Sequence, residues 1–285
     1  MRCASIVVGS TIIVALTAVS QAQRPTAPLI EATPAARGSY KVESGPAFGS
    51  PEHVVYRPAD LPAFPARDTL PVMVWGNGGC AINSTRYAGF LATIASHGFL
   101  VVATAAPPGR NGGDATADHL RRAIDWAAAE NRRRGSPLLG KIAGDRVAVM
   151  GQSCGGFLAL ELGADPRVDT TGMFNSGAQG DDRARIPALH GPVLLINGHD
   201  EDFARAASKG TFEAIGTLPV FYGARRGAGH MGTIDHPGGG EFANVAANWL
   251  RWQLKRDRHS ARMFAGSSCD LCTNPNWETA SKRVR

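Results

Sequence analysis

A serine set between glycines is the residue in this sequence whose surroundings point most directly to chemistry. Residues 151–156 read Gly-Gln-Ser-Cys-Gly-Gly, and a candidate buried strand over 146–150 precedes them. In a G-x-S-x-G elbow, the serine occupies a sharp, strained turn between a strand and a helix, so that its hydroxyl projects above the sheet. The pattern alone is weak in a chain with 34 glycines among 285 residues. The strand before it and the helical pattern over 154–162 after it favour Ser153 as a nucleophile.

A serine hydroxyl is a weak nucleophile at neutral pH, so it needs a base within hydrogen-bond reach and a carboxylate that orients the base. On an elbow fold these partners follow in the order serine, acid, histidine. Of the eight histidines, His230 has the required place, because it stands in a glycine-rich loop beyond the expected strand 218–222 and before the last expected helix. We therefore predict His230 as the general base.

Two aspartates in one loop are candidates for the carboxylate. The apolar strand expected over 192–197 is followed by Gly-His-Asp-Glu-Asp, so that either Asp200 or Asp202 could turn toward His230. The aspartate that is not used is expected to be solvated, or to cap the helix that begins near Phe203. The residues by themselves leave both candidates open.

A second glycine-rich turn offers the parts of an oxyanion hole. The expected strand 70–75 is followed by Gly-Asn-Gly-Gly-Cys-Ala. As in an HGGG-type loop, glycines after a strand end leave backbone N–H groups free to point inward. We expect Gly79 or Cys80 to supply one N–H donor and Cys154 to supply the other. Phosphate binding is a weaker interpretation, because the loop has no G-x-G-x-x-G pattern and no lysine follows it.

These loops need a sheet that brings them to one edge, and the rest of the sequence predicts such a sheet. From about Tyr40, apolar or β-rich stretches alternate with helical patterns. The expected strands are 54–57, 70–75, 99–104, 146–150, 192–197 and 218–222, and the expected helices are 87–96, 116–134, 154–162, 203–215 and 241–254. This alternation predicts an α/β fold with a mostly parallel central sheet and helices on both faces.

The two ends of the chain are set apart from this pattern. Residues 1–22 have a basic start, an apolar run over 6–19 and a small-residue cleavage site, which is typical of a signal peptide; an uncleaved anchor is the alternative. We expect a secreted or periplasmic protein without stable membrane insertion after cleavage. We also expect one catalytic domain over 23–258 and a C-terminal tail over 259–285 that packs on the same domain.

Charge and cysteines limit the partners. The net charge is +6, and residues 255–285 hold seven basic and three acidic side chains. No nucleic-acid-binding motif accompanies them, so we expect no nucleic-acid partner. The CxxC at Cys269 and Cys272 lacks the second element that a zinc or redox site requires. We therefore expect no metal and no cofactor. The oligomeric state is not indicated.

Four cysteines remain after removal of the leader, and three pairings are open to them. The donors of an oxyanion hole must converge on one oxygen, which would bring the backbones of Cys80 and Cys154 within the reach of a disulfide. We predict the pairs Cys80–Cys154 and Cys269–Cys272 in an oxidising compartment. The alternative is that Cys154 is only a small buried residue beneath the elbow helix.

Taken in order, these motifs resemble the α/β-hydrolase superfamily, and within it secreted hydrolases related to cutinases, polyester hydrolases and dienelactone hydrolase. The resemblance covers nearly the whole mature chain. Its landmarks are Trp75-Gly-Asn-Gly-Gly-Cys, Ala95-Ser-His-Gly, Gly151-Gln-Ser-Cys-Gly-Gly, Gly229-His-Met-Gly-Thr and the ending from Met263 to Cys272. The resemblance implies Ser153 as nucleophile and His230 as base.

The resemblance also favours Asp202 as the acid. In cutinase-like enzymes the acid lies four residues after a glycine and just before a short apolar-alanine pair, as in Gly198 to Asp202-Phe-Ala. Here the loop also carries Asp200 and Glu201, a departure from many relatives that keeps Asp200 as the alternative.

The spacing of the candidate residues bears on the substrate. Only 49 positions separate Ser153 from Asp202, and they must hold a helix, a strand, a loop and another strand. Too little chain is left for a large lid, so we expect an open site that suits small or accessible esters. The predicted function is a serine carboxylic-ester hydrolase. The alternatives are a deacetylase or polyester hydrolase that acts on polymers, and a non-catalytic binding protein on a hydrolase fold.

Overall fold

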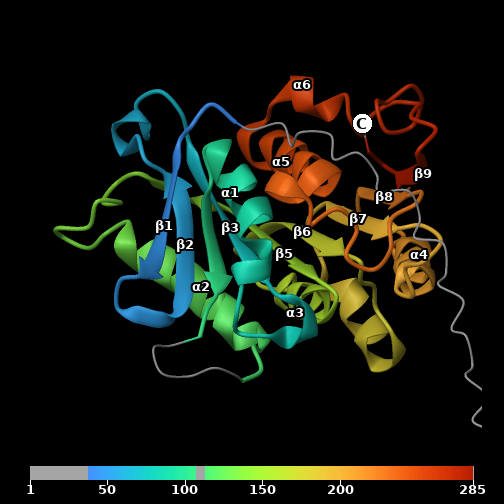
Figure 1. Ribbon diagram of the computed structural model, residues 1–285, viewed down its shortest axis with the longest axis horizontal. Coiled ribbons are helices and arrows are strands. Elements are labelled where there is room, and N and C mark those ends of the chain that lie inside the picture. Colours follow the sequence, from blue (N-terminus) through green and yellow to red (C-terminus); the bar gives the residue numbers. More distant parts are fainter. Residues whose placement is uncertain (1–37, 107–112, 285) are drawn as a thin grey trace, which may run out of the picture. The chain divides into compact units, whose positions relative to one another are not determined.

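A single mixed sheet organises the part of the chain that the computed structural model describes, residues 38–106 and 113–284 (Figure 1). In that part, nine strands follow the order β1-β2-β4-β3-β5-β6-β7-β8-β9. Neighbouring strands from β4 to β8 in this order are parallel, and the pairs β1–β2, β2–β4 and β8–β9 are antiparallel. The mostly parallel sheet predicted from the sequence is confirmed. The predicted signal peptide over 1–22 lies outside the described residues.

The elements have the following bounds. The strands are β1 (Val42–Ala47), β2 (Ser50–Pro58), β3 (Leu70–Gly76), β4 (Leu100–Thr104), β5 (Ile142–Gln152), β6 (Val168–Phe174), β7 (Val193–Gly198), β8 (Val220–Arg225) and β9 (Trp277–Lys282). The helices are α1 (Ala88–Ser96), α2 (Ala117–Glu130), α3 (Cys154–Leu162), α4 (Arg205–Ala214), α5 (Gly240–Lys255) and α6 (Arg258–Ala261). The 3₁₀ turns are η1 (Leu61–Ala63), η2 (Gly78–Cys80), η3 (Thr85–Tyr87), η4 (Gly180–Ala188) and η5 (Pro237–Gly239).

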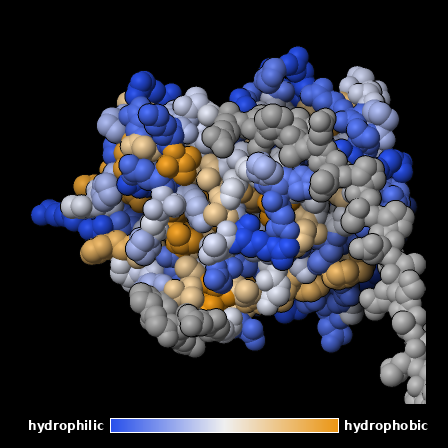
Figure 2. Space-filling model, viewed as in Figure 1, coloured by the Kyte–Doolittle hydropathy of each residue, from blue (hydrophilic) through white to orange (hydrophobic). Residues whose placement is uncertain are grey.

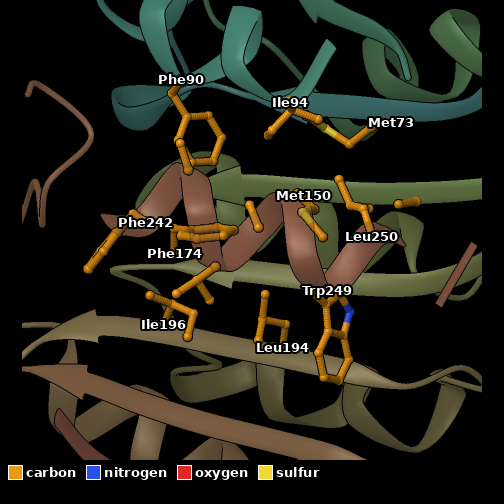
Figure 3. Close-up of a cluster of buried hydrophobic side chains, with 14 of the residues drawn as sticks. Met73, Phe90, Ile94, Met150, Phe174, Leu194, Ile196, Phe242, Trp249 and Leu250 are labelled. Atoms are coloured by element: carbon orange, nitrogen blue, oxygen red, sulfur yellow. The ribbon is translucent and has the colours of Figure 1, made fainter. Parts of the chain in front are cut away.

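Helices cover both faces of the sheet, because successive side chains of each buried strand point to opposite faces. On one face, α1 and α5 pack against side chains of β3, β5, β6 and β7 (Figure 3). Phe174 lies at the centre of this layer, with ring centroids 5.5 Å from Phe90 of α1 and 6.1 Å from Phe242 of α5. On the other face, α2, α3 and α4 pack against the alternate residues of the same strands. This arrangement agrees with the predicted α/β-hydrolase fold.

Three strands were not placed by the sequence pattern, and tertiary pairing explains two of them. β1 contains glycine and proline and has little apolar alternation, but it pairs along its length with β2. β9 is short and polar, and it pairs with β8 from Trp277 opposite Arg225 to Lys282 opposite Val220. The third, β6, is the additional strand that the spacing between Ser153 and Asp202 requires.

The helix predicted over 116–134 ends earlier, at Glu130, for a specific reason. The next residue, Asn131, turns its side-chain amide toward the first residue of β5. Its Nδ2 donates to the carbonyl of Ile142 at 2.9 Å, and its Oδ1 accepts the N–H of Ile142 at 3.0 Å. An amide that pairs in this way with a strand backbone competes with helix continuation.

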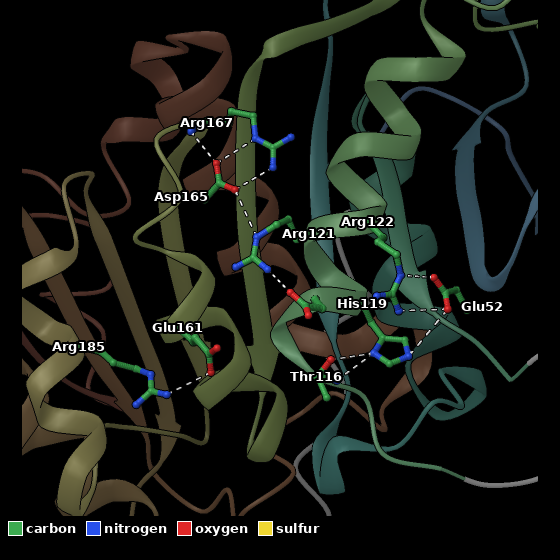
Figure 4. Close-up of polar contacts among 10 residues, drawn as sticks. Glu52, Thr116, His119, Arg121, Arg122, Glu161, Asp165, Arg167 and Arg185 are labelled. Carbon is green, nitrogen blue, oxygen red and sulfur yellow. Dashed lines mark hydrogen bonds and ion pairs between the residues drawn. The ribbon is translucent and has the colours of Figure 1, made fainter.

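Charged side chains around α2 are joined in pairs (Figure 4). Arg122 Nε lies 2.5 Å from Glu52 Oε1, and the guanidinium beside Glu52 lowers the pKa of that carboxyl. Arg167 contacts Asp165 at 2.8 Å, and Arg121 approaches the same carboxylate at 3.9 Å. Much of the basic charge on this side of the molecule is therefore balanced locally.

The surface shows hydrophobic residues in several separate places among hydrophilic ones (Figure 2). Among the described residues, the large hydrophobic side chains with high exposure are Phe48, Leu139 and Phe203. No helix in this part of the chain combines the length and the apolar character needed to cross a bilayer.

Candidate active site

Ser153 occupies the sharp turn between β5 and α3 that the sequence predicts. Its backbone has φ 53° and ψ −119°, a conformation that is strained for a residue with a side chain. The turn needs close contact between strand and helix, since a Cβ on Gly155 would collide with the carbonyl of Gly76 at the end of β3. The Ser153 N–H donates to the carbonyl of Phe174 at 2.9 Å. The local geometry is therefore that of a nucleophile elbow.

The three residues singled out from the sequence lie in one hydrogen-bonded series. His230 Nε2 lies 2.9 Å from Ser153 Oγ, and His230 Nδ1 lies 2.8 Å from Asp202 Oδ1. Asp202 has a fully buried side chain, whereas that of His230 is 22% exposed. A hydroxyl, an imidazole and a buried carboxylate in this order can move a proton from the serine to the imidazole while the carboxylate orients the ring.

Asp202 is held by several donors and therefore has a fixed orientation. Its Oδ2 accepts from Asn175 Nδ2 at 2.7 Å and from the N–H of Gly198 at 3.1 Å. Its Oδ1 accepts the N–H of Ala204 at 3.0 Å in addition to the contact with His230. The bond to Ala204 closes a turn before α4, which begins at Arg205 and not at 203 as predicted.

The competing aspartate lies elsewhere. The side chain of Asp200 is 66% exposed and pairs with Nδ1 of His199. His199 Nε2 in turn lies 2.8 Å from Glu278 of β9. Asp200 is thus directed toward the β9 edge of the sheet, while Asp202 is the aspartate that contacts His230.

Two further residues at the site were not singled out in the sequence. Asn175 follows β6 with φ 47°, and it donates to both Asp202 and the carbonyl of Gly229. Phe203 directly follows Asp202 and stacks on the His230 ring with centroids 3.8 Å apart, while it remains 77% exposed. An asparagine after a strand and an aromatic residue beside the candidate acid were the available signals, but asparagine is common in turns and a single aromatic residue forms no pattern.

The glycine-rich loop after β3 lies beside the elbow. A disulfide joins Cys80 of this loop to Cys154, with Cα atoms 5.0 Å apart. A second disulfide joins Cys269 to Cys272. Both predicted pairings are confirmed. Because Cys154 follows Ser153, the first disulfide fixes the Gly79–Cys80 segment next to the nucleophile, where an oxyanion hole requires its donors.

The donors of this loop are not equivalent. The N–H of Gly78 already donates to the hydroxyl of Tyr87 at 2.8 Å. Gly79 and Cys80 have φ of 64° and 48°, so the loop turns through left-handed conformations at these two residues. The arrangement leaves the N–H groups of Gly79, Cys80 and Cys154 as the candidates for an oxyanion hole, as the sequence suggested.

The residues described around the triad do not resemble a metal centre. No group of three or more His, Cys, Asp or Glu side chains within 38–106 and 113–284 is arranged to hold a metal ion. A cavity of about 450 Å³ lies between the β1–β2 hairpin and the end of α2, lined by residues such as Phe48, Trp126 and Arg133. None of the triad residues lines it.

Comparison with known proteins places this geometry in a family. No match was found among curated proteins. Among protein families, residues 15–275 match the PETase family, described as PET hydrolase-like. The match extends over most of the 285-residue chain. The chain therefore belongs to the PETase family, a group of ester hydrolases within the α/β-hydrolase superfamily.

Proposed function

We propose that this protein is a serine carboxylic-ester hydrolase that works through an acyl-enzyme. The observation that carries the proposal is the continuous series from Ser153 Oγ through the His230 ring to Asp202, with distances of 2.9 and 2.8 Å. In this proposal, Ser153 attacks the acyl carbon of the ester, and His230 takes the serine proton and returns it to the leaving alcohol. Asp202 holds the imidazole in the orientation that both steps need.

The tetrahedral intermediate needs donors for its negative oxygen. We assign these to the N–H of Cys154 and to that of Gly79 or Cys80, because the disulfide holds the two segments side by side. Water then attacks the acyl-enzyme with His230 again as the base, which releases the carboxylic acid and restores Ser153.

The proposed substrates are small esters and the accessible ester groups of polymers. Between α3 and β7, the chain holds β6 and the 3₁₀ turn η4, and no inserted domain separates them. The family description supports a test on poly(ethylene terephthalate) among other polyesters. We further propose that the protein is exported, which the two disulfides support, since such bonds persist in oxidising compartments.

A short-chain p-nitrophenyl ester assay together with fluorophosphonate labelling tests the function. We expect turnover, and a single labelled peptide that contains Ser153. A panel of short esters, acetylated sugars and polyester films then separates small-ester, deacetylase and polymer activities. Absence of both turnover and labelling would favour a non-catalytic binding protein on the same fold.

The pH dependence follows from the role of His230, which must be neutral to accept the serine proton. We expect the highest kcat/KM at neutral to alkaline pH and a decline toward acidic pH, because a protonated imidazole cannot accept the serine proton. The measurement is kcat/KM between about pH 5 and 9. A rate that instead rises as the pH falls through about 5 would contradict a histidine base.

Phe203 is expected to support the orientation of His230. Aromatic stacking contributes about 0.5–1.5 kcal/mol, and this contact is largely exposed. We therefore expect Phe203→Ala to lower kcat by about threefold with little change in thermal stability.

Phe48→Ala is the matched control for Phe203→Ala. Phe48 is also an exposed aromatic residue with one stacking partner, Arg133, at 4.1 Å. It lies on the β1–β2 turn, and β4 and β3 separate that hairpin from β5 in the sheet. Equal losses of kcat in the two variants would argue against a specific role of Phe203.

A further inference from the structure

A buried chain of hydrogen bonds connects the two loops that flank Ser153. The N–H of Gly78, in the loop after β3, donates to the hydroxyl of Tyr87 at 2.8 Å. The Tyr87 hydroxyl donates to Oε1 of Gln152 at 2.9 Å. Nε2 of Gln152 donates to the backbone carbonyl of His230 at 3.0 Å. The chain therefore runs from the proposed oxyanion loop, through the residue before the nucleophile, to the proposed base.

The direction of this chain is fixed at both ends. A backbone N–H can only donate, so the Tyr87 oxygen must accept from Gly78 and direct its own proton toward Gln152. A backbone carbonyl can only accept, so the NH₂ group of Gln152 must face His230 and its oxygen must face Tyr87. Burial raises the pKa of the Tyr87 hydroxyl, which therefore remains a donor at the pH of the assay.

Both side chains are buried, so their polar atoms have little access to water. The exposed fraction is 4% for Tyr87 and 1% for Gln152. Burial makes an unmade hydrogen bond costly, by about 1–3 kcal/mol for each group. Space around the chain is also limited, since a Cβ on Gly78 would lie 2.6 Å from the Tyr87 oxygen. The loop after β3 must therefore keep its backbone against Tyr87.

We propose that Gln152 and Tyr87 are positioning residues that hold the oxyanion loop and the His230 loop in a fixed relation to Ser153. The proposal rests on the proposed ester hydrolysis. Gln152 ends β5 and directly precedes Ser153. Its side chain therefore connects both loops to the strand that carries the nucleophile. The disulfide fixes the oxyanion loop at Cys80, and this chain fixes it independently at Gly78. The same chain contacts the backbone carbonyl of His230, whereas Ser153 and Asp202 contact its imidazole ring.

The test uses two substitutions that conserve shape and a double variant. Tyr87→Phe removes the hydroxyl and leaves the bond from Gln152 to His230. Gln152→Met removes both bonds of the amide with little change in volume. We expect each single variant to lower kcat by at least about tenfold with a smaller change in KM, because displacement of reacting groups by a fraction of an ångström affects the transition state more than binding. The rate of labelling by a fluorophosphonate should fall in parallel.

The double variant distinguishes a connected chain from two independent effects. In a connected chain, the second substitution has little left to disrupt, so we expect the double variant to resemble the more impaired single variant. Losses that multiply independently would overturn the proposal, as would single variants with wild-type kcat. Should Gln152→Met not fold, Gln152→Glu replaces it, because it keeps an acceptor for Tyr87 and removes the donor to His230.

Thr170→Val is the matched control for loss of buried hydrogen bonds. Thr170 is buried near the start of β6, donates to the carbonyl of Pro192 at 2.7 Å and accepts from Trp249 Nε1 at 2.9 Å. It lies toward the opposite end of β6 from Phe174, whose carbonyl accepts the N–H of Ser153. We expect this variant to lose stability and to keep its kcat. A parallel loss of kcat in Thr170→Val would assign the effect to general destabilisation and overturn the positioning role. Absence of turnover in the wild-type protein would instead refute the proposed function itself.

Discussion

Asp202→Asn is expected to lower kcat by about four orders of magnitude while the fold persists. An amide whose NH₂ group faces His230 donates to Nδ1, so the ring proton moves to Nε2 and the ring loses the tautomer that accepts the proton of Ser153. Asn175, Gly198 and Ala204 also donate hydrogen bonds to the Asp202 carboxylate. The substitution disturbs these bonds, because an amide has one acceptor oxygen where the carboxylate has two. We therefore expect some loss of thermal stability as well. Steady-state kinetics and circular dichroism measure the two effects separately.

Asp200→Asn is the matched control for this substitution. It changes the same chemical group two residues away, on a side chain that is exposed and directed to His199. We expect its kcat to remain close to that of the wild type. The assignment of the acid would be wrong if Asp200→Asn were the crippling change and Asp202→Asn were mild.

Removal of the disulfide beside the nucleophile is expected to affect both stability and rate. In the double variant Cys80→Ser/Cys154→Ser, the backbone N–H donors are retained but the covalent connection is lost. The two cysteines are 74 positions apart, and a disulfide that closes a loop of this length restricts the unfolded chain by about 4 kcal/mol. We expect a loss of unfolding free energy of about 2–4 kcal/mol and a fall in kcat of about tenfold, because the donors are no longer held at one distance from the oxyanion.

The second disulfide provides the control. Cys269 and Cys272 are three positions apart, so their bond restricts the unfolded chain much less. We expect Cys269→Ser/Cys272→Ser to retain kcat and to lose less stability, as measured by denaturant unfolding under non-reducing conditions. Unchanged kcat in Cys80→Ser/Cys154→Ser would show that the oxyanion loop keeps its place without the bond.

The sequence predicts the buried part of the fold well because burial leaves a periodic signal. The inner strands β3, β4 and β7 are buried along their length and mostly apolar, since helices cover both faces of the sheet. The apolar pattern of the sequence was insufficient to predict the two edge strands. β1 and β9 are half-exposed, and they are strands because β2 and β8 offer unpaired backbone groups beside them. Pairing of this kind depends on residues far away in the sequence.

The candidate site was predictable where a local motif sets the backbone and unpredictable where side chains from several loops meet. The elbow requires the positive φ of Ser153, and the order of motifs gives His230. By contrast, the choice between Asp200 and Asp202 depended on a resemblance, because both residues belong to one short loop. The contacts of Gln152 with Tyr87 and His230 arise only when β5, η3 and the loop after β8 are brought together. No spacing in the sequence encodes them.

The pairing of β9 with β8 has a consequence for how the chain reaches its final state. An unpaired edge strand is a template for association with another chain, and β8 remains such an edge until residues 277–282, which follow it only after α5 and α6, are in place. Lys282 then donates to the carbonyls of Phe212 and Ile215 at the end of α4, at 2.7 and 3.0 Å. The new outer edge is a short strand with Glu278 and Lys282 on it, and charges of this kind disfavour further strand addition. Residues 277–282 thus protect the β8 edge against association with another chain.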